Sequence, residues 1–345
     1  MKEDYLPTGT RNRICIAMVF NQLKGARGEE DAEYDEPETI YAIKRAIERK
    51  GFETTLIEAD INCLQKLKEL KERKKEKTAL VFNIAEGTGK GARESQVPVM
   101  LEMLGIPYTG SDSSTLAIAL DKARTKEILH YYGIPTPRFQ VLWNGEEEIG
   151  DLRYPLFIKP LLEGSSIGIS ERSLVKSEDQ LRELSRELIK RLKEPLIVEE
   201  FLDGREFTVA LLGNKPEVLP IIELDFSSLP EEKRFDCFEV KWYLDENKLV
   251  CPAHTDTELK GALEKIAIET FRALRCRDLC RIDMRLDEKG EPNVIDVNPL
   301  PGLAPDPEEN SRFPRACYAA GMSYDEIIWA IIDAAMRRYE GSCYI

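Results

Sequence analysis

The chain has 345 residues, of which 42% are hydrophobic and 32% are charged, and its formal net charge is −14. This length suits about two or three domains with a sizeable core. A nucleic-acid binder needs the opposite charge, so that class is disfavoured. No apolar run approaches the ~20 residues that span a bilayer, and the N-terminus has no apolar signal core. We therefore expect a cytoplasmic protein without a membrane contact.

The chemistry of the chain is predicted to rest on carboxylates, lysines, arginines and backbone amides. Histidine occurs only as His130 and His254, which disfavours His-rich metal sites. Cys276 and Cys280 are the only close pair of cysteines, and no second pair stands at zinc-finger spacing. We expect reduced, packed thiols.

The first third of the chain alternates strand and helix patterns. The basic run at 66–77 is expected to be the solvated face of a helix. The sequence GTGKG at 87–91 lacks the full G-x-G-x-x-G spacing and predicts a tight turn. The alternation implies a parallel sheet, with strands over 13–20, 52–59 and 77–85 and helices over 37–50 and near 93–104.

After Gly110 the pattern changes to helices and strands that look antiparallel. The stretch EGSSIGIS is predicted to be a small-residue loop. The succession predicts α/β structure followed by α+β structure, with helices over 121–133, 177–192, about 256–275 and 323–339, and strands over 155–160, 195–202, 205–213 and 216–224.

The stretch RIDMRLDEKGEPNVIDVNPLPG predicts a hairpin with its turn near residue 290. Charged and apolar residues alternate in its first strand. In the second strand we expect Val294, Asp296 and Asn298 to share one face. Only one register keeps the apolar faces together, and it sets Asp283 opposite Asp296 and Arg281 opposite Asn298.

Two opposed carboxylates destabilise a strand pair, so a cation is expected between them. Two alternatives stay open. Arg281 or Arg285 could form a structural ion-pair network, or a divalent metal could bind. Asp283, Asp296 and Asn298 supply only oxygen ligands, which suit Mg²⁺ or Mn²⁺, the usual companions of ATP.

A phosphate cradle is predicted before this hairpin. Lys159 ends an apolar strand, where a solvated lysine would be out of pattern. Gly164, Ser165 and Ser166 follow it in a loop whose backbone amides could approach an anion closely. The loop is not a Walker A motif, because no G-K-[ST] follows.

A nucleotide edge is predicted at IVEEFLDGREF. Backbone groups near Phe201 could hydrogen-bond an adenine. Glu199 and Glu206 are carboxylates on the same strand edge, where one could bind ribose hydroxyls. Standing alone, this stretch would instead indicate exposed acids at a strand end.

Five motifs in order then resemble the ATP-grasp superfamily, specifically the D-alanine–D-alanine ligase family: DKARTKEILHYYGIPTP, FIKPLLEGSSIGIS, IVEEFLDGREFTVALLG, CRIDMRLDEKGEP and VIDVNPLPGL. The resemblance runs from about 105 to 335. It implies an ATP-grasp fold with a Rossmann-like (pre-ATP-grasp) parallel-sheet domain at 1–115, a central lid domain at 116–203 and a C-terminal catalytic domain at 204–345.

The resemblance also implies roles for single residues. ATP and two Mg²⁺ (or Mn²⁺) ions are the implied cofactors, with Asp283, Asp296 and Asn298 as metal ligands. Ser165 is implied beside the substrate, and Arg281 and the Gly302 amide at the oxyanion. The implied nucleotide-binding residues are Lys122, Lys159, Gly164, Ser166, Glu199, Phe201, Leu202, Glu206 and Lys241, the last of which also acts in catalysis.

The implied activity is an Mg-ATP-dependent carboxylate–amine ligase that acts through an acyl phosphate, on small-molecule substrates and often as a homodimer. Departures from the family pattern fall on the substrate side. Glu86 stands where the family has His, Trp242 where it has Tyr, and the segment 303–314 is longer. We expect Glu86 to meet a substrate ammonium and Arg312, beside Ser311, a carboxylate. The alternatives are a ligase for another amino acid, peptide or small carboxylate, and a non-catalytic ATP-binding protein.

Overall fold

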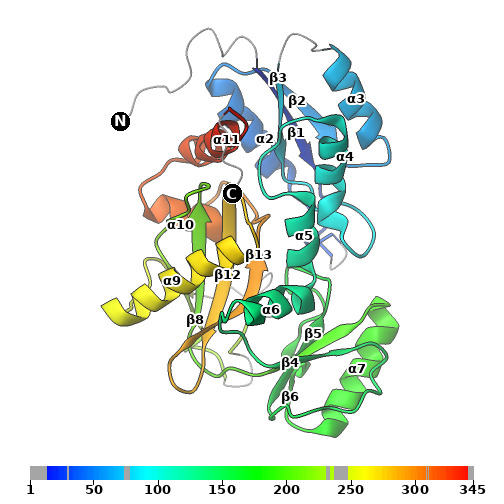
Figure 1. The fold of residues 1–345 in the computed structure, drawn as a ribbon, viewed down its shortest axis with the longest axis vertical. Coiled ribbons are helices and arrows are strands. Elements are labelled where there is room, and N and C mark those ends of the chain that lie inside the picture. The colour runs from blue at the N-terminus through cyan, green and yellow to red at the C-terminus, as the bar shows by residue number, and fades with distance from the viewer. Residues whose placement is uncertain are drawn as a thin grey trace.

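The predicted parallel sheet is present at the N-terminal end of the chain (Figure 1). A computed structural model of the protein describes residues 14–28, 31–73, 78–230, 234–236, 248–307, 309 and 311–340. Lys241 and Trp242 lie outside the described residues. The strands run in the order β2-β1-β3, and both pairings are parallel. They are β1 (Ile14–Phe20), β2 (Thr54–Glu58) and β3 (Thr78–Asn83).

The helices around this sheet follow the predicted pattern. Gly51 adopts a φ of 86° just after the first helix ends, a left-handed conformation that glycine takes readily at a helix C-terminus. The predicted helix near 93–104 begins with a single 3₁₀ turn. The elements are α2 (Pro37–Arg49), α3 (Cys63–Arg73), η1 (Arg93–Ser95) and α4 (Gln96–Leu104).

The middle of the chain forms a four-stranded antiparallel sheet in the order β4-β7-β5-β6. The predicted helix over 177–192 is capped by Ser177, whose side chain accepts a hydrogen bond from the amide of Gln180. The helix α5, which was not predicted, is capped by Asp112. The elements are α5 (Ser113–Leu120), α6 (Lys122–Tyr131), β4 (Phe139–Leu142), β5 (Leu156–Pro160), η2 (Glu171–Ser173), β6 (Leu174–Val175), α7 (Glu178–Leu192) and β7 (Leu196–Glu200).

The last part of the chain forms a six-stranded sheet in the order β11-β10-β8-β12-β13, with β9 paired to β8. The strand predicted over 216–224 is divided in two, and Pro220, which has no N–H for a ladder, lies between the halves. The elements are β8 (Glu206–Leu212), β9 (Glu217–Val218), β10 (Ile222–Asp225), β11 (Lys248–Val250), α9 (Thr257–Ala273), β12 (Leu279–Leu286), β13 (Pro292–Asn298), α10 (Arg312–Ala319) and α11 (Tyr324–Glu340).

The predicted register of the hairpin is confirmed. Arg281 pairs with Asn298, and Asp283 pairs with Asp296. The predicted strict alternation of the second strand is wrong, because the register shifts directly after Asp283. Val294 therefore does not share the face of Asp296, and is buried in the same core as Val297. The bulge places one extra residue in the second strand. Asp296 and Asn298 can therefore share one face while Val294 and Val297 both stay buried.

One hydrophobic core joins the first sheet to the last one, whereas the middle sheet has a core of its own. Figure 1 shows α11 beside α2, although the two helices lie at opposite ends of the sequence. Shared burial of this kind holds the two sheets together. The joint core includes Met18, Ile43, Phe82, Ile222, Phe313 and Ile331, and the core of the middle sheet includes Leu142, Ile158, Leu184, Leu196 and Val198.

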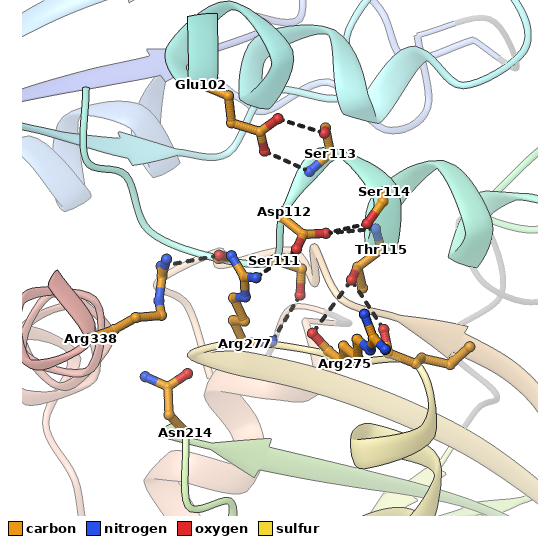
Figure 2. Close-up of polar contacts among 12 residues, drawn as sticks. Glu102, Ser111, Asp112, Ser113, Ser114, Thr115, Asn214, Arg275, Arg277 and Arg338 are labelled. Carbon is orange, nitrogen blue, oxygen red and sulfur yellow. Dashed lines mark hydrogen bonds and ion pairs between the residues drawn. The ribbon is translucent and has the colours of Figure 1, made fainter. Parts of the chain in front are cut away.

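A polar network reinforces this junction around the start of α5 (Figure 2). Asp112 pairs with Arg277 at 2.7 Å. The fully buried Asp278 accepts a 2.8 Å hydrogen bond from the amide of Gly110 and pairs with Arg338 of α11, also at 2.8 Å. Three distant segments thus meet at one carboxylate.

We expect Asp278→Ala to lower the free energy of unfolding by roughly 3 to 5 kcal/mol, because it leaves the Arg338 guanidinium and the Gly110 amide without their partner. Urea denaturation followed by circular dichroism measures the effect. Glu146→Gln is the control. It breaks an exposed pair with Arg186 and should leave the unfolding midpoint close to that of wild type. Equal unfolding midpoints for the two variants would contradict the prediction.

Candidate active site

A cavity lies between the middle sheet and the last sheet, and it gathers most of the predicted site residues. Phe157, Phe235 and Asp236 also line it, although no prediction named them. The predicted residues in its wall are Lys122, Lys159, Gly164, Ser165, Ser166, Glu199, Phe201, Leu202, Glu206, Arg281, Asp283, Asp296 and Arg312.

Of the predicted site residues that the structure describes, four do not line this cavity: Glu86, Asn298, Gly302 and Ser311. The side-chain oxygen of Asn298 accepts a 2.8 Å hydrogen bond from the Leu300 amide. The Ser311 hydroxyl donates to the carbonyl of Gly302 at 2.8 Å. This hydrogen bond joins the two ends of the segment between these residues. Both contacts shape the chain directly after β13.

Glu199, on the cavity wall, is compensated by two lysines, of which only Lys159 also lines the cavity. Its Oε1 lies 3.2 Å from the Nζ of Lys126 and 3.2 Å from that of Lys159. Burial would raise the pKa of Glu199, but the two lysines lower it below the usual range. Burial in turn lowers the pKa of Lys126 to about 8. Lys126 was not predicted. Its signal was the spacing of four residues from Lys122 on one helix face.

Glu206 forms a second buried pair, with Arg285 at 3.0 Å. Burial raises the pKa of Glu206 to about 7, although the Arg285 charge lowers it. The Arg285 guanidinium also lies 4.8 Å from the ring centroid of Phe201. Arg285 was one of two arginines considered as the counter-ion of Asp283. The structure assigns it to Glu206 instead.

Asp283 is compensated by Arg281, whose Nη2 lies 3.0 Å from Oδ2. Its other carboxylate oxygen accepts a 2.7 Å hydrogen bond from Thr208. Burial would raise the pKa of Asp283, but Arg281 and Arg312 lower it. The opposing Asp296 has no ion pair or hydrogen bond with any described residue. One of the two opposed carboxylates therefore still lacks a cation.

These residues fit a divalent metal by their chemistry. Carboxylate and amide oxygens are the ligands that Mg²⁺ takes, and Asp296 is a cavity-facing charge without a partner. The described residues contain no group of three or more His, Cys, Asp or Glu side chains placed to hold a metal. A site here would therefore consist of two Asp, the Asn298 amide and non-protein oxygens.

The small-residue loop bends sharply over the cavity. Ser165 and Ser166 have φ values of 47° and 59°, a region that residues other than glycine adopt rarely and mostly at ligand sites. The Lys122 amine donates to the carbonyl of Glu163. The Ser166 hydroxyl donates to the carbonyl of Asp236 at 3.2 Å, which connects the loop to the far wall.

Comparison with known proteins decides the family. A family model described as "D-ala D-ala ligase C-terminus" matches residues 128–333. The chain belongs to the D-alanine–D-alanine ligase family. It is 35% identical over 86% of its length to a D-alanine–D-alanine ligase of Syntrophotalea carbinolica, covering 90% of that protein. It is 36% identical over 87% of its length to the uncharacterized protein y4sG of Sinorhizobium fredii, covering 88% of it.

The fold of a solved ligase agrees with this assignment. The structure of D-alanine–D-alanine ligase from Bacillus anthracis complexed with ATP aligns with 95% of this chain and 100% of that one, with a TM-score of 0.73 and 24% identity. The expected ATP-grasp fold of mixed α/β and α+β structure is confirmed. No helix within the described ranges is long and apolar enough to cross a membrane.

This ligase-family chain has a second polar region, an acidic recess of Glu33, Asp35, Glu86 and Glu94 beside the carboxyl end of β3. Arg93 joins it to the small-residue loop. The guanidinium lies 2.5 Å from Glu33 and 3.2 Å from Glu163, and it donates to the Leu162 carbonyl at 2.9 Å. A sequence signal for the recess was Glu86 in place of a family histidine.

Three acids of the recess, Asp35, Glu86 and Glu94, resist ionisation. Burial raises the pKa of Asp35 to about 7 and that of Glu94 to about 8. Burial also raises the pKa of Glu86 well above its usual range, and the nearby charges of Glu33 and Glu94 add to the effect. Glu94 is only 8% exposed. Neither Glu86 nor Glu94 has an ion pair or hydrogen bond with another described residue.

The raised pKa of Glu94 predicts a pH-dependent stability. A carboxyl whose pKa rises from 4.5 to about 8 on folding stabilises the protein most below pH 4.5, and the contribution is lost as the pH rises through 8. We expect Glu94→Gln to raise the free energy of unfolding at pH 9 by roughly 2 to 4 kcal/mol relative to wild type. Urea denaturation at pH 5 and pH 9 measures it. A difference between the two proteins that stays constant with pH would contradict the prediction.

Proposed function

We propose that this ligase joins an amino-acid or peptide carboxylate to an amine with the consumption of ATP. Family membership gives the reaction class, an ATP-dependent, ADP-forming ligase. The observation that carries the proposal is the cavity, where lysines of the middle part of the chain face aspartates and arginines of the last sheet. The fold relative from Bacillus anthracis is described as complexed with ATP.

ATP is proposed to lie along the cavity with its base beside Phe201 and Leu202. The amide of Phe201 already donates to the Pro155 carbonyl at 3.1 Å, so it is not free for the base. Glu206 would exchange its contact with Arg285 for the ribose hydroxyls. The phosphates would lie by the lysines and the loop, with Lys122, Lys159, Gly164 and Ser166 around them and Lys241 added from outside the described residues.

Asp283, Asp296 and Asn298 are proposed to hold Mg²⁺, whose chemistry is to neutralise charge on the phosphate oxygens. Asp296 supports this role because its carboxylate faces the cavity without a protein cation. Asn298 would share its side-chain oxygen between the metal and the Leu300 amide. Two ions follow from the family resemblance alone.

The reaction has two proposed steps. An oxygen of the substrate carboxylate attacks the γ-phosphorus, and the bond to the β-phosphate oxygen of ADP breaks, leaving an acyl phosphate. The amine nitrogen then attacks the acyl carbon, the carbon–oxygen bond to phosphate breaks, and the amine loses a proton to solvent. Arg281 and the Gly302 amide would stabilise the oxyanion between these events, with Ser165 beside the substrate.

The substrate end is proposed to use Glu86 for an ammonium and Arg312, beside Ser311, for a carboxylate. Arg312 is 2% exposed and lies 2.5 Å from Asp236, so a substrate carboxylate would compete with Asp236 for it. The role of Trp242 rests on its place in the sequence. A cytoplasmic homodimer that acts on small molecules, not nucleic acid, is part of the same proposal. The net charge of −14 and the family resemblance support it.

We expect Asp296→Asn to reduce ADP release about 100-fold and to raise the Mg²⁺ concentration for half-maximal activity, because it removes the uncompensated carboxylate. A coupled assay over a Mg²⁺ titration measures both effects. Asp151→Asn, an exposed acid of the middle segment, is the matched control and should behave as wild type. An unchanged Mg²⁺ dependence in D296N would remove Asp296 from the metal site.

The ligase proposal itself is tested by ADP release with pairs of D- and L-amino acids, with mass spectrometry of the products. We expect release only when a carboxylate substrate and an amine are both present, together with a dipeptide. ATP binding without turnover on any pair would leave a non-catalytic nucleotide-binding protein. A product without D-alanine would establish the alternative of another amino acid, peptide or small carboxylate.

A further inference from the structure

The acidic recess holds more carboxyl groups than its own cations can pair with. Arg93 is committed to Glu33, Glu163 and a backbone carbonyl. Arg27, the cation near Asp35, donates to the carbonyls of Ala32 and Tyr34. Glu86 and Glu94 remain without a cationic partner among the described residues.

Glu94 is the observation that points to a ligand. Its exposed fraction is only 8%, yet its carboxyl has no ion pair or hydrogen bond with any described residue. A buried carboxyl without a partner is costly and is rarely kept without a function. A Cβ at Gly87 would lie 2.1 Å from the carbonyl oxygen of Arg93, so the segments that carry Glu86 and Glu94 pack against each other. Arg93 pairs with Glu163 of the small-residue loop at 3.2 Å, which places the recess next to the phosphoryl end of the nucleotide cavity.

The two carboxyls without partners, those of Glu86 and Glu94, are suited to organic cations. The described acids do not assemble into a group that could chelate one metal ion. Two separate carboxyls can each receive one ammonium group, whereas a substrate with only an α-ammonium would match one of them and leave the other buried and unpaired. The recess borders the small-residue loop closely, because a Cβ at Gly164 would lie 2.0 Å from Oε1 of Glu33 and would displace that carboxylate.

We propose that the recess of Glu86 and Glu94 binds two cationic groups of the substrate whose carboxylate is phosphorylated, so that this substrate is a diamino acid or a peptide that begins with one. This inference rests on the proposed ligase function and deepens it. The α-ammonium would form an ion pair with one carboxyl, and the side-chain ammonium would form an ion pair with the other.

The test compares ornithine with norvaline, which has the same carbon chain without the second amine, each in both stereochemical forms, by ADP release from the full-length chain. We expect kcat/KM for ornithine to exceed that for norvaline at least about tenfold in the preferred form. Glu86→Gln and Glu94→Gln should each reduce this ratio about tenfold. Glu183→Gln, an exposed acid of α7, should leave the ratio unchanged.

Equal use of ornithine and norvaline by the wild type overturns the inference. So does a preference for ornithine that persists in both folded variants, because the recess is then not its source. If no amino acid supports ADP release, the ligase proposal fails by itself. Calorimetry of ornithine and norvaline binding in the presence of ATP then tests whether the recess binds the second ammonium group. Tighter ornithine binding that is lost in E94Q supports it, and equal binding overturns it.

Discussion

The pairing of β12 with β13 is the constraint on which the rest of the active site depends. It sets Asp283 against Asp296, an arrangement that repels unless a cation enters. Arg281 compensates only the first of them. The bulge directly after Asp283 then shifts the second strand, and the carbonyl of Ile295 comes within 3.2 Å of the Lys159 amine across the cavity. The bulge in β13 thus lies beside the hydrogen bond that connects the last sheet to Lys159 of the middle sheet.

The carboxylates of the site divide into two groups by their partners. Glu199 and Glu206 are buried with lysine or arginine at hydrogen-bond distance, which offsets the cost of removing their charges from water. Asp296, Glu86 and Glu94 have no such partner among the described residues. The second group lies where ligands are proposed, and there the missing positive charges would arrive with the metal and the substrate. Pairing does not by itself separate structural acids from binding acids, because Glu206 and Asp283 are proposed to bind ligands and yet each has an arginine partner.

Local signals account for what could be predicted from the sequence. The helix that begins after Ser177 and the register of the hairpin follow from a cap and from alternation, which depend on neighbouring residues only. The bulge was missed because nothing in NVIDVN marks it. Glu94 was read as part of an ordinary helix start, since its burial comes from segments distant in the sequence. The ion pair of Arg285 with Glu206 likewise depends on a strand 79 residues away.

The small-residue loop belongs to both binding regions, and this couples them. Its glycine abuts Glu33 of the recess, and its serines line the nucleotide cavity. The middle sheet has its own core, whereas the other two sheets share one. The middle sheet and the loop also contact the last sheet, because Phe157 and Ile169 pack against a cluster that includes Leu224 and Phe226. These contacts fix the position of the loop, in which it abuts Glu33 on one side and borders the cavity on the other. Both binding regions therefore depend on the same packing.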